Sequence, residues 1–120
     1  MIKEKGKVVE KRQQDSVIAD PGTGVAIPIS ISCQVPLVVA DATETNTLAA
    51  PAFVGQEMTI YVYSLAGSGT RAVTAAARVN VTGNTIMTFD TAGDLVVLKA
   101  IDIGGSLVWV IIANDGVALS

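Results

Sequence analysis

The sequence predicts an all-β fold, either an antiparallel β-sandwich or a barrel-like domain, and three observations favour it. Valine, isoleucine and threonine make up 39 of the 120 residues, and side chains branched at Cβ favour pleated strands. Half of the residues are apolar, which is too large a share for a disordered chain. Segments of alternating polarity are separated by turns that contain glycine or proline, the pattern of short strands joined by loops.

The first segment, residues 1–20, is polar except for two short apolar pairs. Residues 1–12 carry a net charge of +3, whereas the rest of the chain carries −6. Pro21-Gly22-Thr23-Gly24 then breaks the chain. We therefore expect a basic N-terminal arm or edge strand at residues 1–20, followed by a turn, and a β-rich domain at residues 21–120. The arm either binds a partner or is a solvated terminus. Fully extended, such an arm reaches about 66 Å, which is enough to cross a neighbouring subunit.

The next elements are expected from period-2 alternation. Residues 25–39 are strand-like, because every second residue from Val25 to Cys33 is apolar or small. Pro28 and Pro36 lack a backbone donor, so they place these pieces at a sheet edge or beside a bulge. Residues 40–47 are polar and are expected to form a connection, whereas residues 57–65 alternate clearly and predict a strand.

The second half of the chain predicts shorter strands and one long hairpin. Residues 71–78 are rich in alanine, but the flanking glycines and the short length favour a strand over a helix. Residues 85–89 predict another short strand. Residues 95–103 and 106–113 flank Gly104-Gly105, a pair that readily adopts the positive φ values of a two-residue hairpin turn.

Both strands of this hairpin are apolar on both faces, so both faces need to be covered. A sandwich covers only the inner face of each sheet, and the outer face then needs a neighbouring subunit or another part of the chain. We expect a homo-oligomer, with the alternative that the body folds over itself. The candidate subunit-interface residues are Val96, Leu98, Val108, Trp109, Val110 and Ile112.

Several classes of function lack the residues that they need. The chain has no histidine and a single cysteine, Cys33, whereas histidine is the usual general base and zinc sites need several His or Cys residues. Asp90, Asp94, Asp102 and Asp115 lie at or near predicted turns, where aspartate bonds to nearby backbone. We therefore predict a protein that is not an enzyme, with no catalytic, cofactor-binding or metal-binding residues.

Charge and hydropathy indicate whether the chain binds nucleic acid, crosses a membrane or is secreted. The acidic body and the absence of aromatic residues in the arm disfavour nucleic-acid binding. The longest apolar run has seven residues, far fewer than the roughly 18–20 that cross a membrane. No apolar segment of a secretory signal follows the first residues, so the chain is expected to stay in the cytoplasm where it is made.

Four segments of the sequence resemble small virion proteins of tailed bacteriophages, in particular capsid decoration (cement) proteins. The resemblance covers about residues 41–120 and leaves out the basic arm. Its residues are Glu44-Thr45-Asn46-Thr47-Leu48-Ala49-Ala50-Pro51, Gly55-Gln56-Glu57-Met58-Thr59-Ile60, Asn80-Val81-Thr82-Gly83-Asn84-Thr85-Ile86, and Leu107-Val108-Trp109 with Ala113-Asn114-Asp115-Gly116-Val117-Ala118-Leu119.

The resemblance implies a homotrimer on the outside of an icosahedral head, made in the host cytoplasm, which binds the major capsid protein and stabilises the joints between capsomers. On this reading the arm is the candidate capsid-binding segment, through Lys3, Lys5, Lys7, Lys11 and Arg12. The alternative is a receptor- or carbohydrate-binding module of a tail or fibre, with Tyr61, Tyr63 and Trp109 as a platform for sugar rings. Core or interface packing is the favoured role for Trp109, because it lies in the most apolar strand.

Overall fold

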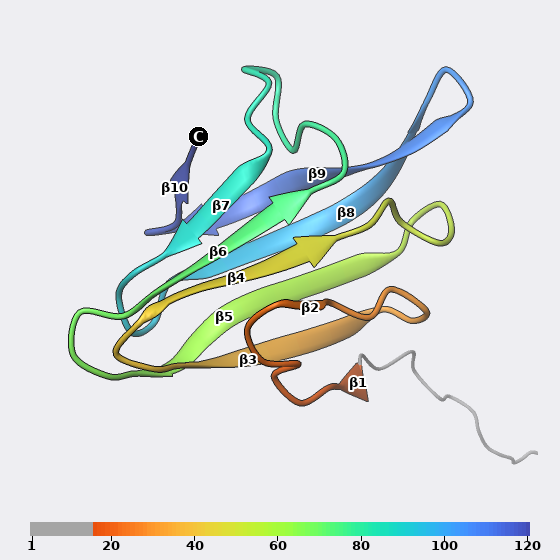
Figure 1. Cartoon of the computed structure of the whole chain (residues 1–120). Coiled ribbons are helices and arrows are strands. Elements are labelled where there is room, and N and C mark those ends of the chain that lie inside the picture. The colour runs from red at the N-terminus through yellow and green to blue at the C-terminus, as the bar shows by residue number, and fades with distance from the viewer. Residues whose placement is uncertain (1–15) are drawn as a thin grey trace, which may run out of the picture.

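The computed structural model describes residues 16–120, which form two five-stranded sheets packed face to face (Figure 1). Sheet A has the strand order β1-β3-β5-β8-β9, and sheet B has the order β10-β7-β6-β4-β2. The strands are β1 (Ser16–Val17), β2 (Val25–Ala26), β3 (Cys33–Val39), β4 (Thr43–Leu48), β5 (Glu57–Leu65), β6 (Thr70–Ala75), β7 (Ile86–Phe89), β8 (Leu95–Ile103), β9 (Ser106–Asp115) and β10 (Ala118–Leu119).

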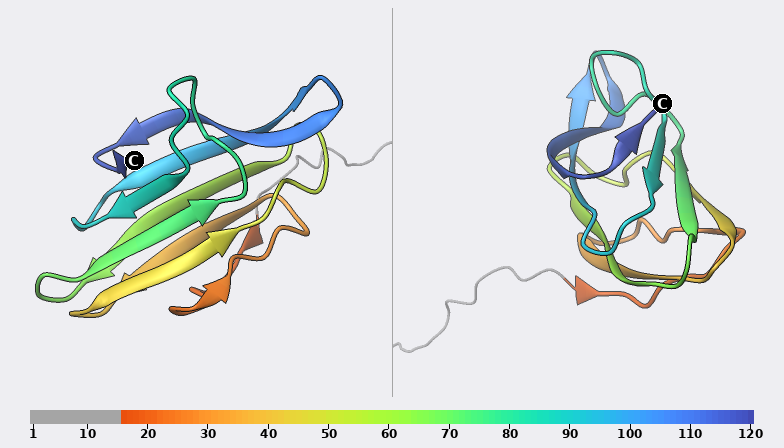
Figure 2. Two further views of the ribbon diagram at one scale, coloured as in Figure 1. Left: turned by 45° about the horizontal axis from the view of Figure 1, so that its top comes forward. Right: turned by 90° about the vertical axis from the view of Figure 1, so that its left-hand side faces the viewer.

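The sheets are mixed rather than antiparallel, so the all-β prediction is confirmed but its antiparallel form is wrong. From β1 to β6 the chain alternates between sheet A and sheet B, and each pair of strands makes one turn of a flattened coil (Figure 2). Strands that are neighbours in a sheet then belong to successive turns and run in the same direction. This makes β1, β3 and β5 parallel in sheet A, and β2, β4 and β6 parallel in sheet B.

Antiparallel strands complete both sheets. β7 pairs with β6 and β10, while β8 pairs with β5 and β9. The predicted hairpin of β8 and β9 is confirmed, and its turn residues Gly104 and Gly105 have φ values of +61° and +92°, the positive values of a type I′ turn. A bulge between Val97 and Leu98 in the β8–β9 register shifts the pairing, so Ile112 has no partner on β8.

The core lies between the two sheets and is filled by the inward side chains of alternating strand positions. Strand β5 shows the pattern: Met58, Ile60 and Val62 are buried, as their period-2 spacing predicted. Sheet B contributes Met87 and Phe89 from β7, both fully buried. The inner face of β8 is covered in the same way, with Val96 and Leu98 fully buried, as a sandwich requires whether or not the outer face has a partner.

Two expected element boundaries are wrong. Residues 25–39 are not one strand, because the chain crosses between the sheets after β2 and returns to sheet A only at Cys33. The buried Gln56 amide holds this crossing by donating to the carbonyls of Ile29 and Ile31, at 2.7 and 3.0 Å. Residues 43–48, expected to be part of a connection, form β4, whose polar residues Glu44 and Asn46 face inward.

The last residues of the segment 1–20 lie against the sandwich, with Ser16–Val17 as the edge strand of sheet A. Ser16 and Val17 pair with Cys33 and Gln34 of β3, and the segment that follows crosses from sheet A to sheet B along the open edge of the sandwich (Figure 2). Residues 16–20 are therefore part of the folded body. The five basic residues proposed to bind the capsid precede residue 16 and lie outside the described residues.

Candidate interaction surfaces

A buried ion-pair cluster lies between the sheets at the edge formed by β3 and β4. Arg71 of β6 is 1% exposed. Its Nε and Nη2 donate to Glu44 Oε1 at 2.9 and 2.8 Å, and its Nη1 and Nη2 donate to Asp20 Oδ1 and Oδ2 at 2.9 and 3.0 Å. Nη1 also donates to Asn46 Oδ1 at 2.9 Å. All five N–H groups of the guanidinium are thus used.

The same cluster completes the edge of sheet A where β1 ends. The N–H of Val38 donates to Asp20 Oδ2 at 2.8 Å. The carbonyl of Val38 lies 3.3 Å from Arg71 Nη2 and shares one of its two hydrogens with a carboxylate. Pro36, two residues earlier, has no N–H to satisfy. These contacts take the place of a neighbouring strand and protect β3 from pairing with another chain. We therefore assign the cluster a structural role.

The charges of the cluster reinforce one another. Burial by itself would raise the pKa of Asp20, but hydrogen bonds from Arg71, Gly22 N–H and Val38 N–H, together with the charge of Arg71, outweigh it and lower this pKa below its usual 3.8. Burial would likewise lower the pKa of Arg71, and its contacts with Asp20 and Glu44 raise it instead. The ionised pair is the stable form in the folded protein.

This lowered pKa predicts that the free energy of unfolding falls in acid. Because the pKa of Asp20 is lower in the folded chain than the unfolded value of 3.8, the unfolded chain binds more protons between the two values, and stability rises with pH there. The contribution of Asp20 is complete well above pH 3.8 and is lost as the pH falls toward the folded pKa. Urea unfolding from about pH 7 to about pH 2.5 measures it. The Asp20→Asn variant should show a flatter dependence, and an equally steep one would contradict the assignment.

Three of the six candidate interface residues lie in the core of the single chain, so they are not available to a partner. Val96 and Leu98 are fully buried and Trp109 is 2% exposed. The Nε1–H of Trp109 donates to the carbonyl of Ala49 at 2.9 Å, which ties β9 to the loop that follows β4. The expectation fails for these residues because the inner face of the hairpin is covered by sheet B. The same burial removes Trp109 from any platform for sugar rings, although Tyr63 is 72% exposed.

The other three candidates lie on the outer side of sheet A. Val108 and Val110 are half-buried, and Ile112 is 54% exposed. Paired positions on neighbouring strands share a face, so Val108 lies beside Ile101 and Val110 beside Lys99. At β9, residues Arg78, Asn80 and Val81 of the loop between β6 and β7 border Val108 and Val110 on this side. Over the rest of the face, the views show no further strand of residues 16–120 (Figures 1 and 2). The half-exposed apolar residues of this outer face are Tyr61, Leu95, Val97, Ile101, Val108 and Val110.

The outer face of sheet B has a different character. Threonines occupy the outward positions of β4, and further threonines lie on β6 and β7. Thr43 pairs with Thr70, and Thr47 pairs with Thr74. This face is polar and uncharged, so of the two it is the outer face of sheet A that offers apolar contacts to a protein partner.

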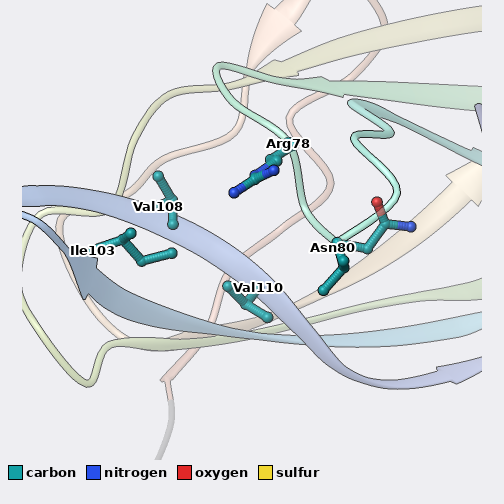
Figure 3. Close-up of a pocket in the computed structure, with 6 residues that line it drawn as sticks. Arg78, Asn80, Ile103, Val108 and Val110 are labelled. Atoms are coloured by element: carbon teal, nitrogen blue, oxygen red, sulfur yellow. The ribbon is translucent and has the colours of Figure 1, made fainter.

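A hollow of about 210 Å³ adjoins the free edge of β9. It lies between the β8–β9 hairpin and the loop that connects β6 to β7 (Figure 3). Its walls are mostly apolar, and Arg78 extends into it from the loop. Within residues 16–120, Arg78 forms no ion pair. The lining residues are Arg78, Asn80, Val81, Ile103, Val108 and Val110.

The sequence did not identify two of these features. The sequence does not reveal the Arg71 cluster, because the polar residues 40–47 predict a connection between strands. Glu44 and Asn46 nevertheless alternate with threonines, as strand residues do. The hollow joins residues from two segments that are about 25 positions apart, and no local pattern indicates such a pair. By contrast, Asp94 and Asp102 bond to backbone N–H groups of their own turns, as predicted.

Residues 16–120 show neither a metal-binding cluster nor a membrane-spanning helix. Among residues 16–120, no three His, Cys, Asp or Glu side chains come together in a way that could hold a metal ion. None of the described elements is a helix with the length and apolar character needed to cross a membrane. Comparison of the chain with models of known protein families and with curated proteins finds no match in either set.

Proposed function

We propose that this protein is a structural virion protein that decorates the outer surface of a tailed-phage head as a homotrimer and acts by binding rather than by catalysis. The observation that carries the proposal is the outer face of sheet A, where half-buried apolar residues of β8 and β9 have no further sheet of residues 16–120 over them. An apolar sheet face of this kind gains stability when a protein partner covers it. The phage setting rests on the resemblance of residues 41–120 to decoration proteins.

Binding would use two separate parts of the chain. The apolar outer face packs against protein, and the basic arm reaches charged positions on the major capsid protein. A trimer presents three copies of each part, so it contacts several capsid subunits at once and gains affinity through multivalency. Because it binds the assembled shell and not its separated subunits, it shifts the equilibrium toward the intact head.

The arm's charge provides the test of this proposal. Lys3, Lys5, Lys7, Lys11 and Arg12 are replaced together by glutamine, and the variant is mixed with heads assembled from the major capsid protein of the same genome. We expect co-sedimentation with heads to be largely lost, since the variant lacks the cations that meet the capsid. The matched control replaces the four lysines by arginine, which preserves the charge and should preserve binding.

The head-binding result is interpreted only if both variants are folded like the original protein. Residues 16–120 are unchanged in both variants, so far-UV circular dichroism and thermal unfolding should match those of the original protein. Equal occupancy of heads by the glutamine variant and the original protein would contradict a capsid-binding arm. Absence of head binding by the original protein would contradict the decoration role itself.

A further inference from the structure

The free edge of sheet A carries backbone groups that can accept another strand. Ala100 of β8 exchanges both its hydrogen bonds with the loop before β5, because its N–H donates to Gln56 and its carbonyl accepts from Gly55. Its partner Trp109 therefore turns its own N–H and carbonyl away from β8, and Leu107, two residues earlier, does the same. Within residues 16–120 nothing bonds to these edge groups.

Another segment meets this edge at Ile111. Its N–H, two residues after that of Trp109, donates to the carbonyl of Val79 at 2.9 Å, so the loop between β6 and β7 takes the place of a neighbouring strand at that point. The open part is thus short and lies directly beside the hollow (Figure 3). Val81 is 95% exposed and Ile103 is 50% exposed at its rim, and Arg78 supplies one positive charge without a described counter-ion.

The open edge of β9, the hollow and Arg78 together indicate which kind of ligand fits this site. Open N–H and carbonyl groups on a sheet edge bind an extended peptide by strand addition. An apolar hollow beside the edge takes one apolar side chain, and Arg78 takes a carboxylate. Because side chains two positions apart project to the same side of a strand, the ligand should carry an apolar residue and an acidic residue at positions i and i+2.

The chain itself contains such a segment. We propose that the edge of β9 binds residues 7–11 of a second copy of this chain in extended form, with Val8 in the hollow and Glu10 against Arg78. Val8 and Glu10 are two positions apart, as the site requires. Residues 1–15 precede β1, which lies at the opposite edge of sheet A from β9, so copies placed side by side bring the arm of one to the β9 edge of the next.

The dimensions permit this exchange. Five residue steps separate Lys11 from Ser16 of β1 and reach at most about 17 Å, whereas the five strands of sheet A span about 19 Å from first to last axis. The arm of the same chain would have to turn back across the outer face of sheet A to reach its own β9. The contact between copies joins two different surfaces, and such a head-to-tail contact closes into a ring, for example a trimer, when the rotation between copies allows it. The contact between copies requires no capsid, so it can be tested independently of the decoration role.

A disulfide between two copies tests the occupant directly. One protein carries Val8→Cys and another carries Val108→Cys, and the two are mixed and oxidised. Facing side chains on adjacent strands are close enough for a disulfide, so we expect a bond that joins position 8 of one variant to position 108 of the other, identified by peptide mapping so that pairs of identical variants are not counted. The matched control pairs Val8→Cys with Thr74→Cys, which lies on the outer face of sheet B, and should yield no disulfide between positions 8 and 74.

Two results would overturn the proposal. The first is a yield from the Val8–Val108 mixture no greater than that from the Val8–Thr74 control. The second uses a single chain that carries both Val8→Cys and Val108→Cys and is oxidised at high dilution. If the disulfide forms completely within this chain, and the mixture of the two single variants gives no disulfide between chains at any concentration, the arm binds its own body and not a second copy.

A charge exchange tests the second contact. Glu10→Arg and Arg78→Glu each place like charges together, and we expect each to weaken self-association about two- to fivefold in analytical sedimentation. The combined variant restores the opposite charges and should recover the original association. A combined variant that associates no better than the weaker single variant would contradict the pairing of Glu10 with Arg78.

Discussion

Replacing Arg71 by methionine is expected to lower the free energy of unfolding by about 3–5 kcal/mol. The change leaves Asp20 and Glu44 without their partner, and their side chains are only 13% and 11% exposed. It also removes the donor to the carbonyl of Val38 at the edge of β3. Since small domains are stabilised by only about 5–15 kcal/mol, this loss is a large part of the total.

Urea unfolding followed by far-UV circular dichroism measures the effect of this substitution. The matched control is Arg78→Met, because Arg78 is exposed and has no ion pair among residues 16–120; its change should stay within about 0.5 kcal/mol. Neutralising Asp20 and Glu44 together with Arg71 should recover part of the loss, because no charge is then left buried alone. Equal losses for Arg71→Met and Arg78→Met would show that the cluster does not stabilise the fold.

Trp109→Ala is expected to lower the free energy of unfolding by about 3–5 kcal/mol, the range for removing a large aromatic side chain from a core. Trp109 is 2% exposed within the single chain, so the loss should not depend on protein concentration. A residue that packs only between subunits would instead show its effect through dissociation. Chemical unfolding at two widely separated protein concentrations distinguishes these cases.

Two further variants refine the result for this residue. Trp109→Phe keeps most of the apolar volume but removes the hydrogen bond to the carbonyl of Ala49. Because Ala49 is exposed, a loss of about 0.5–1.5 kcal/mol is expected from this hydrogen bond. Val108→Ala changes the neighbouring side chain on the outer face and should alter the stability of the single chain by less than about 1 kcal/mol. Emission of Trp109 that is readily quenched by iodide would contradict its place in the core.

Local patterns in the sequence predicted the elements whose geometry depends on neighbouring residues. The strand at residues 57–65 and the hairpin around Gly104-Gly105 have the predicted form, because alternation and positive φ values are properties of a few adjacent residues. The turn aspartates follow for the same reason. The sequence also shows that β8 and β9 are apolar on both faces, and packing in the core accounts for the inner of these two faces.

The partners of each strand were not predictable in this way. Glu44 and Asn46 looked like connection residues, since their role depends on Arg71, which lies 27 positions after Glu44. The hollow beside β9 likewise joins Arg78 and Val81, in the loop between β6 and β7, to Val108 on β9. Contacts of this kind follow from the order of strands, which local alternation leaves open.

By itself, the sequence determined that the protein is built of strands, that its charges divide into a basic arm and an acidic body, and that its last hairpin is apolar on both faces. These are properties of composition and of neighbouring residues. The tertiary structure decided that β1 to β6 alternate between two sheets in a coil, which makes neighbouring strands in that part parallel. It also buries Trp109 and Arg71 and leaves half-buried apolar residues on the outer side of β8 and β9. The physical reason is that a strand's side chains are covered by whichever strands lie across from it, and distant parts of the chain supply them.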